Sequence, residues 1–290
     1  MKYAVTHTTV YRYGHPVLLG HNHTHLSPRS FERQQCEETR LTISPNPAAQ
    51  ESWTDYFGNQ VTYFTLEQEH RELSVTARST VHVRETRWPD PHNTPPWEDV
   101  RDQVLVAEDA ENLAASQFIY DSPFVRRSEE AEQYAAESFF PGRPLLEATL
   151  DLTARIHRDF KFDSTATSIN TPTTEVFRKR RGVCQDFAHL QITCLRSLRL
   201  PARYVSGYLV TDPPPGQARL VGADASHAWV SVFCPGLGWL DFDPTNDQMP
   251  QLRHVTLAWG RDYGDVCPVK GIFLGGGDHS MRIAVDVNPI

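Results

Sequence analysis

The sequence lacks any long apolar segment. No run of roughly 18 apolar residues, the length that a membrane-spanning helix needs, occurs among its 290 residues. The first residues, MKYAVTHTTVYRYGHP, also contain no apolar run long enough for a signal peptide. We therefore expect a protein that works without a membrane.

An excess of positive charge is missing as well. The chain has 28 Lys and Arg residues against 36 Asp and Glu residues, a formal net charge of −8. Nucleic-acid binding usually requires a basic face, so this balance argues against a nucleic-acid partner. One basic run, RKRR at 178–181, is more typical of a solvated loop or helix end than of a binding patch.

Several chemical motifs are absent. The five cysteines are odd in number and widely spaced without a CxxC pair, which favours reduced thiols in a cytoplasm over a disulfide framework. No GxSxG occurs, which disfavours a serine hydrolase, and no DxDxDG calcium loop is present. His21, His23 and His25 would share one face of a strand, but no cysteine or carboxylate stands beside them. We expect neither a metal nor a cofactor.

The pattern along the chain divides it into three parts. Hydrophobic residues make up 39% of the chain, enough for a sizeable core. Residues 1–95 are typical of β-structure: 73–83 alternate between apolar and polar side chains, and 57–60 have turn chemistry. A proline-rich stretch at 88–97 predicts a linker, and 96–160 predicts a helical segment that leads into a catalytic core at 161–290.

Within the core, the order of predicted elements is helix and then strands. Apolar residues at helical spacing predict helices over 144–160 and 184–198, and Pro201 ends the second. Strands are predicted at 202–210, 228–233 and 239–242, with PGLG at 235–238 joining the last two as a hairpin. A final alternating strand covers 281–288. The fold class is therefore α+β.

A cysteine, a histidine and a carboxylate stand in this order in the core. Cys184 opens the predicted helix, where the positive end of the helix dipole favours a thiolate and unpaired backbone N–H groups can bind an oxyanion. His227 lies on the first strand of the hairpin. Asp241 and Asp243 point the same way from the second strand, so spacing alone leaves both as partners of His227. These are the parts of a nucleophilic thiol site.

Three segments resemble the transglutaminase-like superfamily, in particular bacterial members described as candidate cysteine proteases. They read RRGVCQDFAHL, ASHAWVSVFCPGLGWLDFDPTN and HVTLAWGRDYGDV. The resemblance implies that Cys184 is the nucleophile, His227 the base and Asp243, rather than Asp241, the orienting acid. The N-terminal HTTVYRYGHPV and DYFGN are similar to the β-rich region that precedes the core in these bacterial proteins.

The resemblance also implies a fold and a reaction. The fold is papain-like, with the cysteine helix packed on an antiparallel sheet that carries the histidine and the aspartate. The expected chemistry is thiolate attack on an amide of a peptide or protein, through a thioester that passes to water or to an amine. A cysteine peptidase or amidase is the first hypothesis, and a transglutaminase or a non-catalytic binding module on the same fold are the alternatives. Trp229, Asp262 and Tyr263 are the predicted substrate-binding residues, although GRDYGD at 260–265 is equally typical of a turn with a structural Arg–Asp pair.

Overall fold

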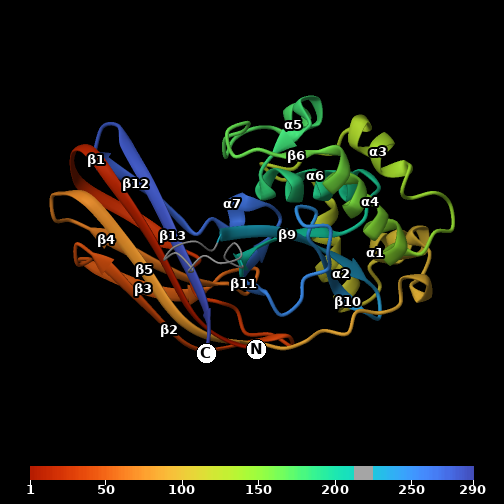
Figure 1. Ribbon diagram of the computed structural model, residues 1–290, viewed down its shortest axis with the longest axis horizontal. Coiled ribbons are helices and arrows are strands. Elements are labelled where there is room, and N and C mark those ends of the chain that lie inside the picture. Colours follow the sequence, from red (N-terminus) through yellow and green to blue (C-terminus); the bar gives the residue numbers. More distant parts are fainter. Residues whose placement is uncertain (212–224) are drawn as a thin grey trace, which may run out of the picture.

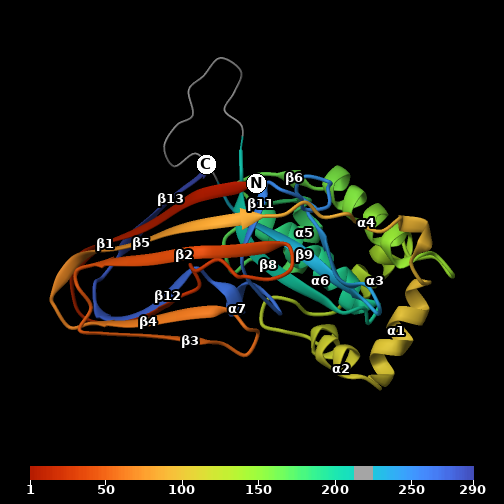
Figure 2. The same cartoon turned by 90° about the horizontal axis from the view of Figure 1, so that it is seen from below.

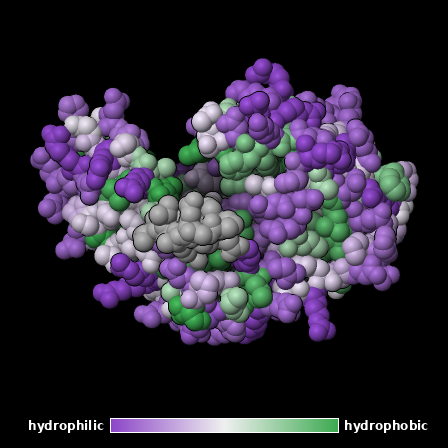
Figure 3. All heavy atoms as spheres, viewed as in Figure 1, coloured by the Kyte–Doolittle hydropathy of each residue, from purple (hydrophilic) through white to green (hydrophobic). Residues whose placement is uncertain are grey.

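A computed structural model describes residues 1–211 and 225–290. It consists of an elongated sheet and a mixed helical and strand part that lie side by side (Figure 1). The first residue and the last strand lie next to each other, since Tyr3 pairs with Pro289. The hydropathy view shows a mostly hydrophilic face that is hollowed between these two parts (Figure 3).

The elongated sheet is built around one strand of 23 residues, β1 (Lys2–Thr24). Its first half pairs with β5 (His70–Val83) and β13 (His279–Pro289), and its second half pairs with β4 (Gln60–Leu66) and β12 (Val269–Gly275). The strands β2 (Gln34–Ser44) and β3 (Ala49–Thr54) form the outer neighbours of β5 and β4. Figure 2 shows these strands as one extended layer. Every pairing in it is antiparallel.

The predicted core of 161–290 differs from the structure in its last two strands, β12 and β13. The sequence from Val269 onward does not join the core sheet, because β12 and β13 pair with β1 in the N-terminal sheet. The predicted range of 161–290 thus includes about twenty residues that the N-terminal part needs to complete its sheet. The period-two pattern predicted a strand near the C-terminus correctly, but strand pairing over such a sequence distance has no signal in local periodicity.

Helices occupy the middle of the chain, as predicted for 96–160. They include α1 (Trp97–Val106), α2 (Ala110–Ser116), α3 (Glu129–Ala136) and α4 (Leu145–Asp159), with short 3-10 turns η1 (Pro91–Asn93) and η2 (Gln117–Ile119). The predicted helix over 144–160 is thus confirmed as α4. None of the helices among the described residues is both long and apolar enough to cross a membrane.

The core sheet has four antiparallel strands in the order β10-β9-β8-β11. They are β8 (Ala202–Leu209), β9 (Ala225–Cys234), β10 (Gly238–Phe242) and β11 (His254–Gly260), which confirms the predicted hairpin between β9 and β10. Two short parallel strands, β6 (Lys161–Phe162) and β7 (Arg181–Gly182), flank α5 (Thr173–Lys179). A single turn, α7 (Tyr263–Val266), follows β11.

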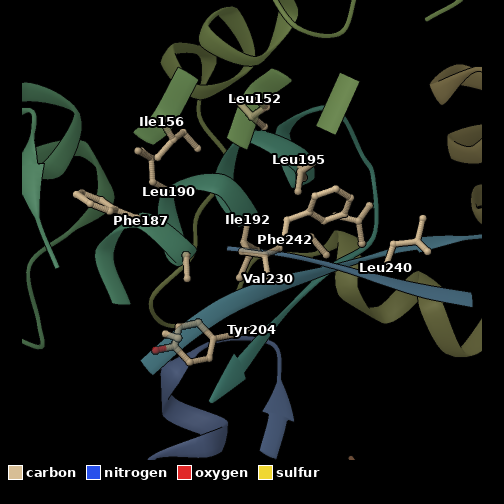
Figure 4. Close-up of a cluster of buried hydrophobic side chains, with 14 of the residues drawn as sticks. Leu152, Ile156, Phe187, Leu190, Ile192, Leu195, Tyr204, Val230, Leu240 and Phe242 are labelled. Carbon is tan, nitrogen blue, oxygen red and sulfur yellow. The ribbon is translucent and has the colours of Figure 1, made fainter. Parts of the chain in front are cut away.

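The helix α6 (Cys184–Ser197) lies at the centre of the molecule, between the core sheet and the other helices. Figure 4 shows Leu190 of this helix toward Ile156 of α4 and Ile192 toward Val230 of β9, all within one buried cluster. Every side chain from Asp186 to Arg196 is buried, including polar ones such as His189 and Arg196. The position of its first residue is therefore fixed by tight packing around the whole helix.

Candidate active site

The cysteine segment is held at the start of α6 by a carboxylate. Asp186, in the first turn, accepts hydrogen bonds from the backbone N–H of Val183 at 2.8 Å and the hydroxyl of Thr167 at 2.6 Å. This backward bond fixes the chain just before Cys184. Burial raises the pKa of Asp186, although both hydrogen bonds act in the opposite direction. Sequence analysis missed this residue, whose third position in the helix is a recognisable capping signal.

Gly182 is required by the same arrangement. A Cβ atom at this position would lie 2.6 Å from a carboxylate oxygen of Asp186. Any side chain would therefore push Asp186 away from Val183 and loosen the start of the helix. This explains in physical terms why glycine precedes the cysteine segment.

His227 and Asp243 form a buried pair beside Cys184. The Nε2 atom of His227 lies 2.7 Å from Oδ2 of Asp243, and neither side chain is more than 5% exposed. Burial by itself lowers the pKa of His227, but hydrogen bonds to Asp243 and Cys184 outweigh it and raise the pKa to about 10. The imidazole therefore favours its charged form when it faces the thiol and the carboxylate.

Asp243 is surrounded by donors. It accepts from the side chain of Asn246 at 2.7 Å, from the backbone N–H groups of Thr245 and Asn246, and from Nε2 of His254 at 3.1 Å. Burial would raise the pKa of Asp243, but the hydrogen bonds from His227 and His254 hold it well below its usual range. The carboxylate thus stays charged in a fixed orientation.

Two of these donors were missed by sequence analysis. Asn246 stands three residues after Asp243 in DPTN, a spacing at which an Asx turn could have been predicted. His254 comes from β11, and no local signal connects it to Asp243. Burial lowers the pKa of His254, so its uncharged ring donates through Nε2 while its buried Nδ1 has no partner among the described residues. With His227 and Asp243, it forms a cluster whose ligand-type atoms lie within 4.8 Å of one another.

Asp241, the alternative carboxylate, has other partners. It accepts hydrogen bonds from Arg33, Ser231 and the indole of Trp229. It does point to the same side of the hairpin as Asp243, but its oxygens are occupied by a side chain from the N-terminal part. The geometry thus pairs His227 with Asp243, the choice that the family resemblance made.

The predicted substrate-binding residues differ in exposure. Trp229 is fully buried against His254 and over Gly207, where a Cβ atom would lie 2.5 Å from its ring. Asp262 is 1% exposed and caps α7 by accepting from the backbone of Gly264 at 2.8 Å. Their burial argues against the predicted contact with a substrate. Tyr263 is only partly buried and packs beside Tyr204, so for this residue the role stays a prediction.

The predicted turn with an Arg–Asp pair is present at 260–265. Both Nε and Nη2 of Arg261 donate to the carboxylate of Asp265 at 2.8 Å.

The N-terminal DYFGN motif contacts the core sheet. Asn59 donates to the backbone oxygen of Trp259 at 2.9 Å and accepts from its N–H at 3.0 Å, which ties the β3–β4 turn to β11. This motif thus attaches the N-terminal sheet to the core.

Comparison with known proteins agrees with this architecture. Residues 3–82 match the model of the bacterial transglutaminase-like N-terminal region, and residues 132–244 match the transglutaminase-like superfamily. An uncharacterized protein of Mycobacterium tuberculosis is 42% identical over 99% of this chain and 93% of its own length. One from Mycobacterium leprae is 31% identical over 98% of this chain and 97% of its own.

Two further matches concern proteins whose names refer to an activity. The solved structure of a candidate cysteine protease from Cytophaga hutchinsonii has a TM-score of 0.76 at 21% identity, and covers 100% of this chain and 91% of that one. At this identity the likeness concerns the fold. A protein-glutamine gamma-glutamyltransferase of Pseudomonas aeruginosa is 32% identical over 34% of this chain and 16% of its own length. The family models and the full-length relatives together show that the chain belongs to the transglutaminase-like superfamily and carries its bacterial N-terminal region.

Proposed function

We propose that the protein is a thiol enzyme that cleaves amide bonds of a peptide or protein substrate through a thioester. Cys184 is the nucleophile, His227 the base and Asp243 the group that orients it. The observation that carries this proposal is the buried 2.7 Å contact between His227 and Asp243, with Cys184 hydrogen-bonded to the same imidazole. A base that meets a thiol on one side and a carboxylate on the other is arranged for proton transfer.

The first half of the reaction follows from this arrangement. Because Asp243 occupies Nε2 of His227, Nδ1 is the nitrogen left to take the proton of the thiol. The sulfur forms a bond to the amide carbon, and the carbonyl oxygen gains negative charge near the free N–H groups that begin α6. The C–N bond then breaks, and His227 gives its proton to the departing amine.

The second half returns the enzyme to its starting state. Water attacks the thioester carbon and gives a proton to His227, the carbon–sulfur bond breaks, and the proton returns to sulfur as the acid leaves. We propose hydrolysis rather than transfer to an amine, because water is abundant unless a site excludes it. The name of the Pseudomonas aeruginosa relative supports the alternative of acyl transfer to an amine.

The nucleophile is tested by alkylation. Iodoacetamide at mild pH is expected to modify Cys184 faster than Cys36 and Cys267, which are also partly accessible and serve as internal controls. Peptide mapping by mass spectrometry reports the three rates separately. If Cys184 reacts no faster than the other two, the thiol enzyme is excluded and the binding module becomes the better hypothesis.

The fate of the thioester is tested by partition. An amide substrate is first identified in a peptide library. The enzyme then receives this substrate with and without a high concentration of a primary amine, and the acid and amide products are quantified by mass spectrometry. Predominant acid supports the hydrolase, whereas predominant amide at modest amine concentration supports the transglutaminase. A cytoplasmic location stays a prediction, which rests on five cysteines that are all described and all unpaired.

A further inference from the structure

A pocket of about 330 Å³ opens where three parts of the chain meet, away from the Cys184 site. Its walls are the aromatic side chains of Phe57 from the β3–β4 turn, Phe118 from η2, and Trp239 and Trp259 from the core sheet. Phe118 meets the ring of Trp239 edge-on at 5.2 Å. These four rings, with Tyr56 and Phe233, make the lining largely aromatic, and Arg203 is its one positively charged side chain.

Arg203 is buried in this pocket without a hydrogen bond. It is 8% exposed, and its guanidinium lies between two indole rings, 4.1 Å from the centre of Trp239 and 3.8 Å from that of Trp259. Its Nε is buried without an acceptor, and no hydrogen bond joins its other nitrogens to any residue in 1–211 or 225–290. Stacking satisfies the faces of the guanidinium but leaves its N–H edge without an acceptor, which is costly for the buried Nε.

The surrounding charges leave this edge without a counterion of its own. Asp241, the carboxylate that acts on Arg203, is already bound by Arg33, Ser231 and Trp229. Arg29 adds a second positive charge on the far face of Trp259, at 3.6 Å. Burial lowers the pKa of Arg203 to about 9, with Asp241 opposing and both Arg29 and Arg33 adding to the shift. An incoming anion would relieve this excess of positive charge.

The rim limits the kind of anion. Glu111 of α2 lines the pocket and is exposed, so it would repel a group with several negative charges such as phosphate. A single carboxylate matches the planar N–H edge of a guanidinium with two parallel hydrogen bonds. The aromatic walls match a flat apolar group attached to that carboxylate.

We propose that this pocket binds a carboxylate carried on a flat apolar group, with the carboxylate on the open edge of Arg203 and the apolar group against the aromatic walls of the pocket. The ligand is either a free aromatic acid or the terminal carboxylate of a peptide that ends in an aromatic residue. The site is separate from the thiol site, because Trp239 precedes Asp243 by four residues along β10 and its continuation, about 13 Å in an extended strand. It does not depend on the proposed catalysis.

Binding to the pocket is tested with benzoate, and benzyl alcohol, which has the same ring without the negative charge, is the control compound. Because Trp239 and Trp259 line the pocket, benzoate is expected to change indole fluorescence in a saturable way and to raise the melting temperature. Benzyl alcohol should bind at least tenfold more weakly. Equal binding of the two compounds, or no saturable change with millimolar benzoate, overturns the proposal.

A second experiment distinguishes a free aromatic acid from a peptide C-terminus as the ligand. It uses two peptides that end in phenylalanine, one with a free carboxylate and one amidated. Tighter binding of the free acid than of benzoate supports a peptide ligand, and weaker binding supports a small aromatic acid. The amidated peptide is expected not to bind. Binding of the amidated peptide as tight as that of the free acid contradicts the role of Arg203.

Variants test the pocket itself. Arg203→Met should weaken benzoate binding at least tenfold, while Arg12→Met, an exposed arginine paired with Glu72, is the matched control and should bind normally. Because Arg203→Met can also unfold the core, Ala114→Phe at the exposed mouth is a second test that should block the pocket and leave Arg203 in place. Normal benzoate binding by Ala114→Phe overturns the proposal. A Cys184→Ala variant should bind benzoate normally, which separates this site from the thiol site.

Discussion

Two buried carboxylates, one in β10 and one directly after it, lie two residues apart and have different surroundings. Asp241 is 3% exposed and is bound by Arg33, Ser231 and Trp229. Asp243 is fully buried and is bound by His227, His254 and Asn246. Neither the residue type nor the burial distinguishes the two sites. Their partners do.

The difference is between a fixed charge and a mobile proton. A guanidinium does not lose its proton in proteins, so Arg33 and Asp241 can only hold each other and, with them, the N-terminal part against the core. An imidazole can take up and release a proton, so the cluster of Asp243 can take part in chemistry. The comparison predicts loss of reactivity at one site and loss of stability at the other.

Asp243→Asn should have the largest effect. Without the carboxylate, the imidazolium of His227 is no longer stabilised, and turnover is expected to fall on the order of a thousandfold or more. The rate of Cys184 alkylation should fall in parallel, which gives a measurement that needs no substrate. Asp241→Asn is the matched control and should keep most of the alkylation rate. A variant at Asp241 that is the more impaired of the two would reverse the assignment.

Asp241→Asn should instead lower the free energy of unfolding. Arg33 would be left partly buried without its counterion, a loss on the order of 2 kcal/mol. Urea unfolding followed by circular dichroism measures this value. Combining Asp241→Asn with Arg33→Met should recover part of the loss, because no unpaired charge then remains. Unfolding that is unchanged by Asp241→Asn would contradict the structural role.

The pH dependence of stability should distinguish the two clusters further. The pKa of His227 is raised from 6.5 to about 10 in the folded protein, despite the opposing effect of burial. The protonated imidazole of His227 therefore contributes to the free energy of unfolding. This contribution is fully present below pH 6.5 and is lost as the pH rises through about 10. The stability advantage of the wild type over His227→Gln should therefore shrink between these limits. An advantage that grows with pH would contradict the pairing.

His254→Gln should have the smallest effect. It removes one of several hydrogen bonds to the carboxylate of Asp243, a loss expected to slow Cys184 alkylation on the order of tenfold. The pH at which alkylation is half-maximal should shift as well, which a purely structural substitution would not cause. Thr256→Ser, a conservative change on the same strand, is the control. An unchanged pH profile in His254→Gln would make this residue part of the packing around Trp229 only.

Much of the core could be predicted because its elements are local. The helix from Cys184, the β9–β10 hairpin and the helix from Leu145 follow from apolar spacing, turn residues and Pro201. The family resemblance was needed to select Asp243, because two side chains on the same face of a strand have the same local signal. β-Structure was predicted for residues 1–95, but the length of β1 was not, since its many threonines and histidines interrupt the apolar alternation.

The sequence by itself determined the order of the reactive groups, the helix start at Cys184 and the hairpin that carries His227 and Asp243. Those features depend on residues close together in the chain, because local hydrogen bonds and the spacing of apolar side chains determine helices and hairpins. Only the tertiary structure decided that β12 and β13 complete the N-terminal sheet, that His254 reaches Asp243 and that Arg203 lies between two tryptophans. These contacts join distant segments, and they depend on how the two sheets pack rather than on any local preference.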